Sequence, residues 1–533
     1  MGTVLNDRDL IQRIVYSSPA GEKMTRFLTA FWLTAAIVTC SVSMSQTRPN
    51  IVLFLADDMG YSDLGCYGGE VQTPNLDRLA HSGLRFTQFY NTARCWPSRA
   101  AILTGYYAQQ VRRDTIPGLV ANGTEGVRPG WAPLLPAYLR PLGYRSYHSG
   151  KWHLDGKALE NGFDRSYMLL DTDRHFNPRE HREDDKSLPP IEPNTGYYST
   201  TAIASHAITY LDEHAQRYGA QPFFEYVAFI SPHFPLQAPA EDIAKYRGWF
   251  RQGWDSLREQ RLWRMKRLGI VDCPLSARTP GVPAWSTLSS SEKAKWTAHM
   301  EVHAAMVDRM DHEIGRVVAK LRSMNALDNT VILFLSDNGA SAEKLVRGDG
   351  NDPSAAPGSA ASFICLEPPW ANLANAPLRL SKIFTHEGGI STPLIIHWPR
   401  GIKAKNVLRR SPSHVIDLVP TILEIAGGAK PAKWNGLSAP AAPGHSLSPL
   451  FRNDGAVEHD YLWWFHSENR ALRVGNWKLV SAGKNSPWEL YDLATDRGET
   501  HNLAAKDGGR VKNMAELWQA RLEEFTATAA RDR

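Results

Sequence analysis

The chain has 533 residues, of which 43% are hydrophobic and 22% charged, with a net charge of +5 and a pI near 8.8. This composition excludes a disordered chain and indicates a globular protein long enough for two domains. The sequence has no Lys/Arg-rich run that would indicate a nucleic-acid-binding protein. Its five scattered cysteines form no CxxC pair, which argues against a disulfide framework and a structural zinc site.

The N-terminal segment has the pattern of an export signal. Arg26 precedes an apolar run from residue 27 to 39, and small residues follow at 41–43. This pattern predicts a secretory signal peptide, translation starting at Met24, and a secreted or periplasmic protein whose mature chain has no stable membrane span. An uncleaved N-terminal anchor is the alternative.

The mature chain opens with an unbroken apolar run at residues 51–56. Such a run predicts a strand buried on both faces of a mainly parallel sheet. The run ends at Asp57-Asp58, and Gly60 follows as a turn residue.

The next element is a helix that begins near Cys95, because Pro97 fits a first helical turn. A helix N-terminus attracts anions and lowers the pKa of a thiol. Arg99, one turn further on, can bind an oxyanion with two N–H groups. The pattern predicts a nucleophile beside an anion pocket, with a buried, inert cysteine as the alternative.

The middle of the chain alternates strand and helix patterns. Residues 171–196 read as a long polar loop, and residues 223–230 as a strand ending before His233. Apolar residues spaced by three and four over 307–321 predict an amphipathic helix. It leads into a second apolar strand at 331–335, which ends at Asp337-Asn338.

The last third of the chain changes in composition. Residues 347–362 read as a second long loop, and residues 394–398 as a strand. Beyond residue 430, short aromatic and β-branched runs separated by turn residues predict a small antiparallel sheet, and residues 514–525 a closing helix. We therefore expect an α/β fold: a large, mainly parallel central sheet flanked by helices, with a smaller C-terminal antiparallel sheet plus helix. The expected divisions are an upstream stretch and signal peptide at 1–48, a catalytic domain at 49–430 and an α+β subdomain at 431–533.

Four polar side chains follow the two buried strands: Asp57, Asp58, Asp337 and Asn338. Ligands bind at the carboxyl ends of strands in open α/β sheets, and converging carboxylates there favour a bound cation. Oxygen ligands predict Ca²⁺, with Mg²⁺ second. The alternative is that these residues only cap helices and form turns.

Several motifs together resemble the type I sulfatases of the alkaline phosphatase superfamily, and the segment 370–399 is most similar to bacterial arylsulfatases. The similar motifs are Cys95-x-Pro97-Ser98-Arg99 with Leu103-Thr104-Gly105, Gly150-Lys151-Trp152-His153, Ser231-Pro232-His233, and Lys382 before Glu387-Gly388-Gly389. The resemblance spans residues 49–505 and departs from the family pattern at Arg379-Leu380-Ser381, where many members have glycines.

The resemblance implies a sulfuric ester hydrolase acting on aryl or carbohydrate sulfates, with Cys95 oxidised to formylglycine by a maturation enzyme. It implies six catalytic residues, which are Cys95, Arg99, Lys151, His153, His233 and Lys382. It also implies a metal site formed by Asp57, Asp58, Cys95, Asp337 and Asn338.

The resemblance also implies a mechanism. The hydrated formylglycine attacks sulfur, Asp337 takes its proton, and His153 deprotonates the second hydroxyl so that sulfate leaves. Arg99 and Lys151 hold the formylglycine oxygens, while Lys382 and His233 bind sulfate and either of them can protonate the leaving group. A phosphoester or phosphonate monoester hydrolase of the same superfamily is the alternative, and a non-catalytic sulfated-glycan-binding protein is a remote one.

Overall fold

Strand β1 (Asn50–Ala56) lies at the centre of the main sheet and is buried on both faces. Its side chains alternate between two cores, with Val52 and Phe54 in one and Ile51 and Leu53 in the other. This division explains why the run is apolar without interruption, since neither face of the strand meets solvent. The computed structural model describes residues 48–346 and 351–531, so the predicted signal peptide lies outside the described residues.

The main sheet is eleven-stranded within the described residues, in the order β10-β2-β9-β8-β1-β7-β3-β4-β5-β6, with β11 also paired to β2. Its central strands β8, β1, β7, β3 and β4 are parallel. The strands span Leu84–Tyr90 (β2), Arg145–Lys151 (β3), Arg165–Leu169 (β4), Phe223–Ala228 (β7), Thr330–Ser336 (β8), Ser391–His397 (β9), Val407–Arg409 (β10) and Ser413–His414 (β11). The prediction of a large, mainly parallel sheet is confirmed.

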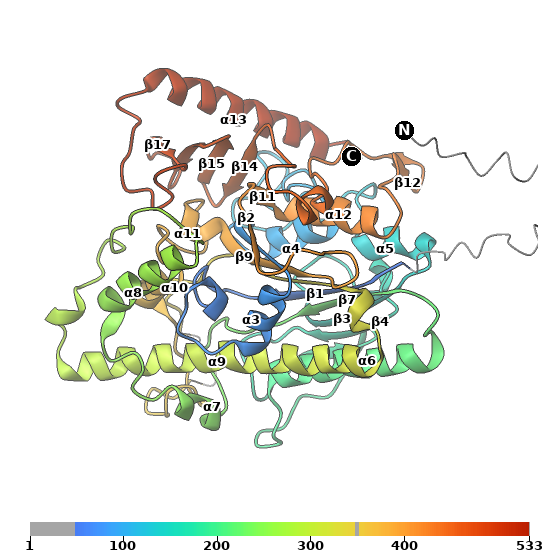
Figure 1. Ribbon diagram of the computed structural model, residues 1–533, viewed down its shortest axis with the longest axis horizontal. Helices are drawn as coiled ribbons and strands as arrows, with labels where there is room; N and C mark the ends of the chain where they lie inside the picture. Colours follow the sequence, from blue (N-terminus) through green and yellow to red (C-terminus); the bar gives the residue numbers. More distant parts are fainter. Residues whose placement is uncertain (1–47, 347–350, 532–533) are drawn as a thin grey trace, which may run out of the picture. The chain divides into compact units, whose positions relative to one another are not determined.

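Helices cover both faces of this sheet (Figure 1). One core contains residues of α3 (Pro74–His81), α6 (Ser199–Arg217), α8 (Gly253–Arg267), α9 (Ser290–Ser323) and α10 (Glu367–Ala374). The other contains residues of α4 (Cys95–Thr104), α5 (Leu135–Leu139) and α12 (Leu418–Ile425). Two short helices, α7 (Ala240–Lys245) and α11 (Glu387–Ile390), complete the layers.

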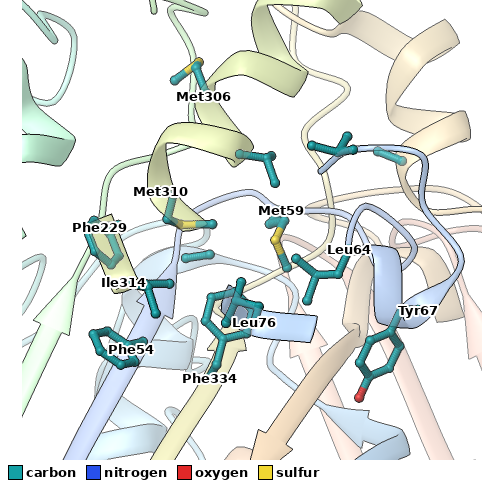
Figure 2. Packing of buried hydrophobic residues seen from close by; sticks show 14 of the residues in the cluster. Phe54, Met59, Leu64, Tyr67, Leu76, Phe229, Met306, Met310, Ile314 and Phe334 are labelled. Carbon is teal, nitrogen blue, oxygen red and sulfur yellow. The ribbon is translucent and has the colours of Figure 1, made fainter. Parts of the chain in front are cut away.

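The predicted amphipathic helix is the C-terminal half of α9, which runs along one edge of the view in Figure 1. It begins with a capping box formed by Ser289 and Glu292. Figure 2 shows Met310 and Ile314 of this helix packed against Phe54 and Phe334 of the central strands. This packing holds β1 and β8 in place, and both strands end at the predicted site.

The C-terminal part contains an antiparallel sheet of four strands, β14 (Leu462–His466), β15 (Asn469–Val474), β16 (Trp477–Ser481) and β17 (Glu489–Asp492). Helix α13 (Gly508–Ala529) packs on it through Trp518 and Phe525. The predicted small sheet and closing helix are confirmed. Arg48–Arg533 falls into one compact unit, and the division near residue 430 stays a prediction.

Two local features differ from expectation. The polar segment 171–196 contains a short hairpin, β5 (His181–Glu183) and β6 (Lys186–Ser187), which extends the edge of the main sheet from β4. A second hairpin, β12 (Lys433–Trp434) and β13 (Leu437–Ser438), was not predicted. These strands are too short and too polar to show a periodic signal. Residues 351–362 have no helix or strand, as expected for a loop.

Among the helices of the described ranges, none combines the length and the apolar character needed to cross a membrane.

Candidate active site

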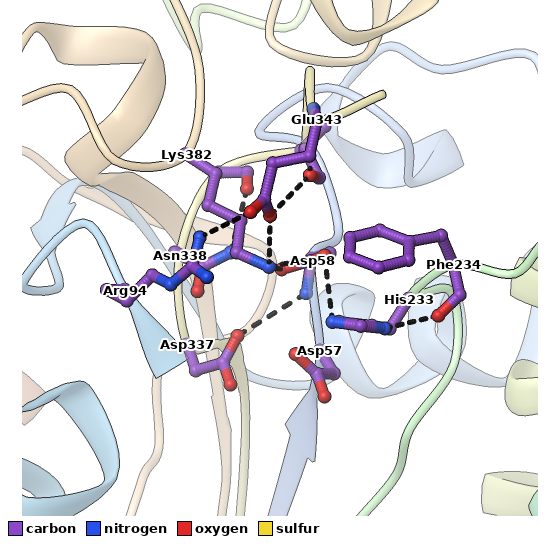
Figure 3. Close-up of polar contacts among 12 residues, drawn as sticks. Asp57, Asp58, Arg94, His233, Phe234, Asp337, Asn338, Glu343 and Lys382 are labelled. Carbon is purple, nitrogen blue, oxygen red and sulfur yellow. Dashed lines mark hydrogen bonds and ion pairs between the residues drawn. The ribbon is translucent and has the colours of Figure 1, made fainter. Parts of the chain in front are cut away.

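The ends of β1 and β8 bring the predicted metal-binding side chains together. The two strands pair in parallel with Ala56 opposite Ser336, so the residues that follow them emerge side by side. The backbone N–H of Asp58 donates to Asp337 Oδ1 at 3.3 Å, and Asn338 Nδ2 donates to Asp58 Oδ1 at 2.6 Å (Figure 3).

Three cationic side chains surround these carboxylates. Arg99 Nη2 lies 2.8 Å from Asp337 Oδ2, Lys151 Nζ lies 2.5 Å from Asp57 Oδ2, and Lys382 Nζ lies 2.8 Å from a carboxylate oxygen of Asp58. All of these residues are buried. Buried charges of this number are tolerated because groups of both signs lie close together.

The buried charges shift one another's pKa values. Burial raises the pKa of Asp57, but Lys151, His233 and Arg99 outweigh it and hold that pKa below its usual range. Burial, and then the charge of Asp57, raise the pKa of Asp337 to about 7. The surroundings therefore favour the ionised form of Asp57 and disfavour that of Asp337.

Cys95 is the first residue of α4, with Arg94 as the N-cap. The side chain is 2% exposed, and burial raises the pKa of its thiol to about 12. The expectation that the helix N-terminus lowers this pKa is wrong, because loss of hydration outweighs the helix dipole and the nearby lysines. The unmodified thiol is therefore a poor nucleophile at neutral pH.

The oxygen-rich cluster fits a divalent cation. One ligand atom from each of Asp57, Asp58, Cys95 and His233 lies within 4.8 Å of the others. Asp57 Oδ1 and Asn338 Oδ1 are buried without a hydrogen-bonding partner among the described residues. Buried oxygens without partners are costly, and a hard cation satisfies them.

Five of the six predicted catalytic residues line one cavity of about 350 Å³, and these are Cys95, Lys151, His153, His233 and Lys382. Arg99 is fully buried and is not part of the cavity wall. A larger cavity of about 480 Å³, lined by Arg128 and Trp434 among others, contains none of the predicted residues.

Two histidines approach the cavity from different elements. His233 follows β7, its Nδ1 lies 2.5 Å from the carbonyl of Phe234, and its Nε2 lies 3.6 Å from Asp58 Oδ2. His153 follows β3, has a φ of 52° and packs edge-on against Trp96. Burial lowers the pKa of His153 to about 4, although Glu125 opposes this shift.

Sequence reasoning missed two charged residues of the cavity wall, Arg94 and Glu343. Arg94 Nη1 lies 2.9 Å from Glu343 Oε1, and Lys382 Nζ lies 3.1 Å from Glu343 Oε2. Burial raises the pKa of Glu343, but Lys382 and Arg94 reverse this and lower it to about 2. The only sequence signal for Glu343 is its place five residues beyond Asn338.

Comparison with known protein families identifies the kind of protein that has this site. The family model described as sulfatase matches residues 49–429. This chain belongs to the sulfatase family. A second model, described as the C-terminal part of N-sulphoglucosamine sulphohydrolase, matches residues 379–528. The sulfatase is thus an enzyme that hydrolyses sulfate esters, which excludes the non-catalytic binding protein.

Individual relatives of this chain are likewise named as sulfatases. The sulfatase is 35% identical over 518 residues to an uncharacterized sulfatase of Schizosaccharomyces pombe, covering 88% of this chain and 93% of that protein. It is 32% identical over 418 residues to an arylsulfatase of Klebsiella aerogenes, covering 72% and 87%.

Solved structures share the fold at lower identity. A sulfatase from Pseudoalteromonas has a TM-score of 0.62 at 19% identity, with 92% of each chain covered. A phosphonate monoester hydrolase of Agrobacterium radiobacter has a TM-score of 0.58 at 20% identity, covering 90% of the sulfatase and 96% of that chain. These similarities establish the fold, namely a mainly parallel sheet flanked by helices with a small C-terminal antiparallel sheet.

Proposed function

We propose that the sulfatase cleaves sulfate monoesters of aryl or carbohydrate alcohols, with position 95 matured to formylglycine and one divalent cation bound. The observation that carries the proposal is the position of Cys95 at the first turn of α4, among the ligand atoms of Asp57, Asp58 and His233. A thiol with a pKa near 12 is a poor nucleophile, which favours a modified residue here.

The cation would be held by Asp57, Asp58, Asp337 and Asn338, together with the modified residue 95. When bound, it supplies Lewis-acid polarisation of the sulfate group. Several carboxylate oxygens with few waters suit Ca²⁺ better than Mg²⁺.

The hydrated aldehyde at position 95 supplies two hydroxyls, one to attack sulfur and one whose deprotonation expels sulfate. Asp337 accepts the proton of the attacking hydroxyl. His153 accepts the proton of the second hydroxyl. Arg99 and Lys151 hold the oxygens at position 95.

Lys382 and His233 bind the sulfate group, and one of the two protonates the leaving alcohol. Both line the cavity, and both lie close to Asp58. Their placement supplies donors where negative charge grows on the substrate oxygens.

The decisive experiment combines mass spectrometry of the residue-95 peptide with turnover of an aryl sulfate. We expect formylglycine in the active fraction and sulfate release that depends on it. Full activity with an unmodified thiol would overturn the proposal.

A phosphoester or phosphonate monoester hydrolase is the second candidate, since the phosphonate monoester hydrolase of Agrobacterium radiobacter shares this fold. Phosphate and sulfate esters share tetrahedral geometry. A kcat/KM higher for an aryl phosphate or phosphonate than for the matching aryl sulfate would favour this candidate.

We further propose that the protein is secreted or periplasmic and depends on a formylglycine-generating enzyme. The apolar run at 27–39, preceded by Arg26, supports export. N-terminal sequencing of exported protein tests this, with a start beyond residue 40 expected.

A further inference from the structure

We propose that Glu125 is a positioning residue for His153, accepting a hydrogen bond from its Nε2–H and leaving Nδ1 as the nitrogen that takes up a proton. This inference rests on the proposed function, in which His153 is the base that allows sulfate to leave. Glu125 lies outside every motif that identified the site.

The two side chains are in contact. His153 Nε2 lies 3.3 Å from Glu125 Oε1, and their side chains are 30% and 34% exposed. A histidine that acts as a base needs one ring nitrogen tied to an acceptor, because that bond fixes both the tautomer and the plane of the ring.

The other ring nitrogen is free to act. His153 Nδ1 is buried and has no hydrogen-bonding partner among the described residues. A neutral imidazole has one donor and one acceptor nitrogen. If Nε2 donates to Glu125, the acceptor is Nδ1, and this is the atom available to a hydroxyl in the cavity that His153 lines.

Glu125 is itself held in place. Arg113, whose side chain is 3% exposed, forms an ion pair with Glu125 and donates to the carbonyl of Gly126 at 2.5 Å. Arg113 Nε also lies 3.6 Å from Asp155 Oδ1, and Asp155 in turn pairs with Arg128 at 2.7 Å. A buried guanidinium thus fixes the carboxylate, and the carboxylate fixes the imidazole.

The backbone and a neighbouring ring restrict His153 further. Its φ of 52° lies in the left-handed region, which a non-glycine residue adopts only when its surroundings impose it. The Trp96 ring meets the imidazole edge-on, with centroids 5.5 Å apart. The ring therefore has little freedom to turn, and the remaining choice, which nitrogen carries the proton, is set by Glu125.

The carboxylate also compensates charge. When His153 takes a proton at Nδ1 it becomes a cation close to the ammonium groups and guanidinium of the site, and the negative charge of Glu125 stabilises it. A neutral amide at position 125 would keep a hydrogen-bond acceptor without this charge. Glu125→Gln therefore removes the charge and keeps an acceptor that can orient His153, whereas Glu125→Ala removes both.

The first measurement needs no turnover. In protein with unmodified Cys95 and ¹⁵N-labelled histidine, the signal lost in His153→Ala identifies the His153 ring. We expect a protonated Nε2 and an unprotonated Nδ1 in the wild type, and a mixture of tautomers in Glu125→Ala. The same tautomer in both proteins would overturn the proposal.

The second measurement is kinetic, with an aryl sulfate and matured enzyme. We expect kcat to fall about 10- to 100-fold in Glu125→Ala and by less in Glu125→Gln, with KM changed less than twofold. A rapid burst of released aryl alcohol should precede the slow steady state, because only release of sulfate is impaired. Glu160→Gln, a change at an exposed glutamate paired only with Lys157, should behave as wild type.

The kinetics of the His153 and Glu125 variants distinguish failure of the positioning role from failure of the proposed function. If His153→Ala loses turnover while both Glu125 variants keep the wild-type kcat, the positioning role is wrong and the proposed function stands. If His153→Ala keeps the wild-type kcat, the proposed function is wrong, and the positioning role that rests on it is withdrawn as well.

Discussion

Lys382 Nζ lies 2.8 Å from a carboxylate oxygen of Asp58, although the two residues are 324 positions apart in the chain. The contact links the segment before α11 to the end of β1. It places the positive charge of Lys382 beside the carboxylates that follow the strand. Asp58 itself has a φ of 66°, so its side chain is directed by a backbone conformation that few residues adopt.

Asp58→Ala is expected to abolish metal binding and activity together, because it removes a proposed ligand and leaves Lys382 paired with Glu343 alone. Metal content by mass spectrometry and turnover of an aryl sulfate check this. Exhaustive chelation should likewise inactivate the wild type, and Ca²⁺ should restore activity better than Mg²⁺. Asp272→Ala, at a fully exposed carboxylate, should retain both metal and activity. Undiminished turnover after chelation would contradict the metal site.

His233→Ala is expected to lower kcat by about 10²- to 10⁴-fold, the usual contribution of a positioned acid or base. The melting temperature should change little, since the side chain lines a cavity. His214→Ala should instead lower the melting temperature and leave kcat nearly unchanged, because His214 is buried between Tyr147 and the carbonyl of Gln221. A large loss of stability with kcat retained in His233→Ala would make that histidine structural.

Cys95→Ala is expected to give folded, inactive protein. Cys95→Ser should trap a sulfated protein, because serine has no second hydroxyl to drive release, unless the host also converts serine. Mass spectrometry of the peptide that contains Trp96 distinguishes thiol, formylglycine and sulfated serine. Measurable steady-state turnover by an unconverted serine variant would count against the mechanism.

Glu225→Leu is expected to raise the melting temperature. Glu225 lies in β7 with 0% exposure, and both carboxyl oxygens lack a hydrogen-bonding partner among the described residues. Removing such a group recovers a desolvation cost of about 1–3 kcal/mol, less any packing change.

The buried carboxyl of Glu225 also makes the stability of the folded protein depend on pH, in a predictable direction. Burial raises the pKa of Glu225 well above its usual value, so the folded protein keeps a proton that the unfolded chain releases above about pH 4.3. The wild type should therefore lose stability relative to Glu225→Gln as pH rises, by up to about 1.4 kcal/mol per pH unit. Parallel stability curves for the two proteins between pH 4 and 7 would contradict the burial argument.

Lys478→Met is expected to reduce the free energy of unfolding by roughly 3–5 kcal/mol, because the buried Glu499 loses its ion pair and the buried Glu387 keeps only the one with Arg497. Lys478 Nζ lies 3.0 Å from Glu387 and 2.8 Å from Glu499, all buried. Lys484→Met, at an exposed position in the turn between β16 and β17, serves as the control, and chemical denaturation measures both. Equal unfolding free energies for the two variants would show that the C-terminal sheet does not depend on this ion cluster.

The central strands and the ends of β1 and β8 were predictable because both strands are buried on two faces. Their apolar runs are unbroken, and parallel strands place Asp57 and Asp337 at one edge by geometry alone. The hairpin β5–β6 was not predictable, since its pairing is made by backbone groups of polar residues.

Glu343 and Glu125 were missed for another reason. Each lies in a loop without periodicity. Their contacts include residues distant in sequence, Arg94 for Glu343 and His153 for Glu125, which the sequence does not reveal. The pKa of Cys95 was mispredicted because a helix start is visible in the sequence, whereas the depth of its burial is not.

The burial of Cys95 has a consequence for how active protein is produced. A residue that is 2% exposed once α4 has packed cannot enter the catalytic site of another enzyme, so the proposed conversion to formylglycine would have to come before folding is complete. Modification and folding then compete in time. A host that folds this chain faster than it oxidises it would accumulate well-folded but permanently inactive molecules, and slower synthesis or a lower growth temperature would raise specific activity without raising the total yield.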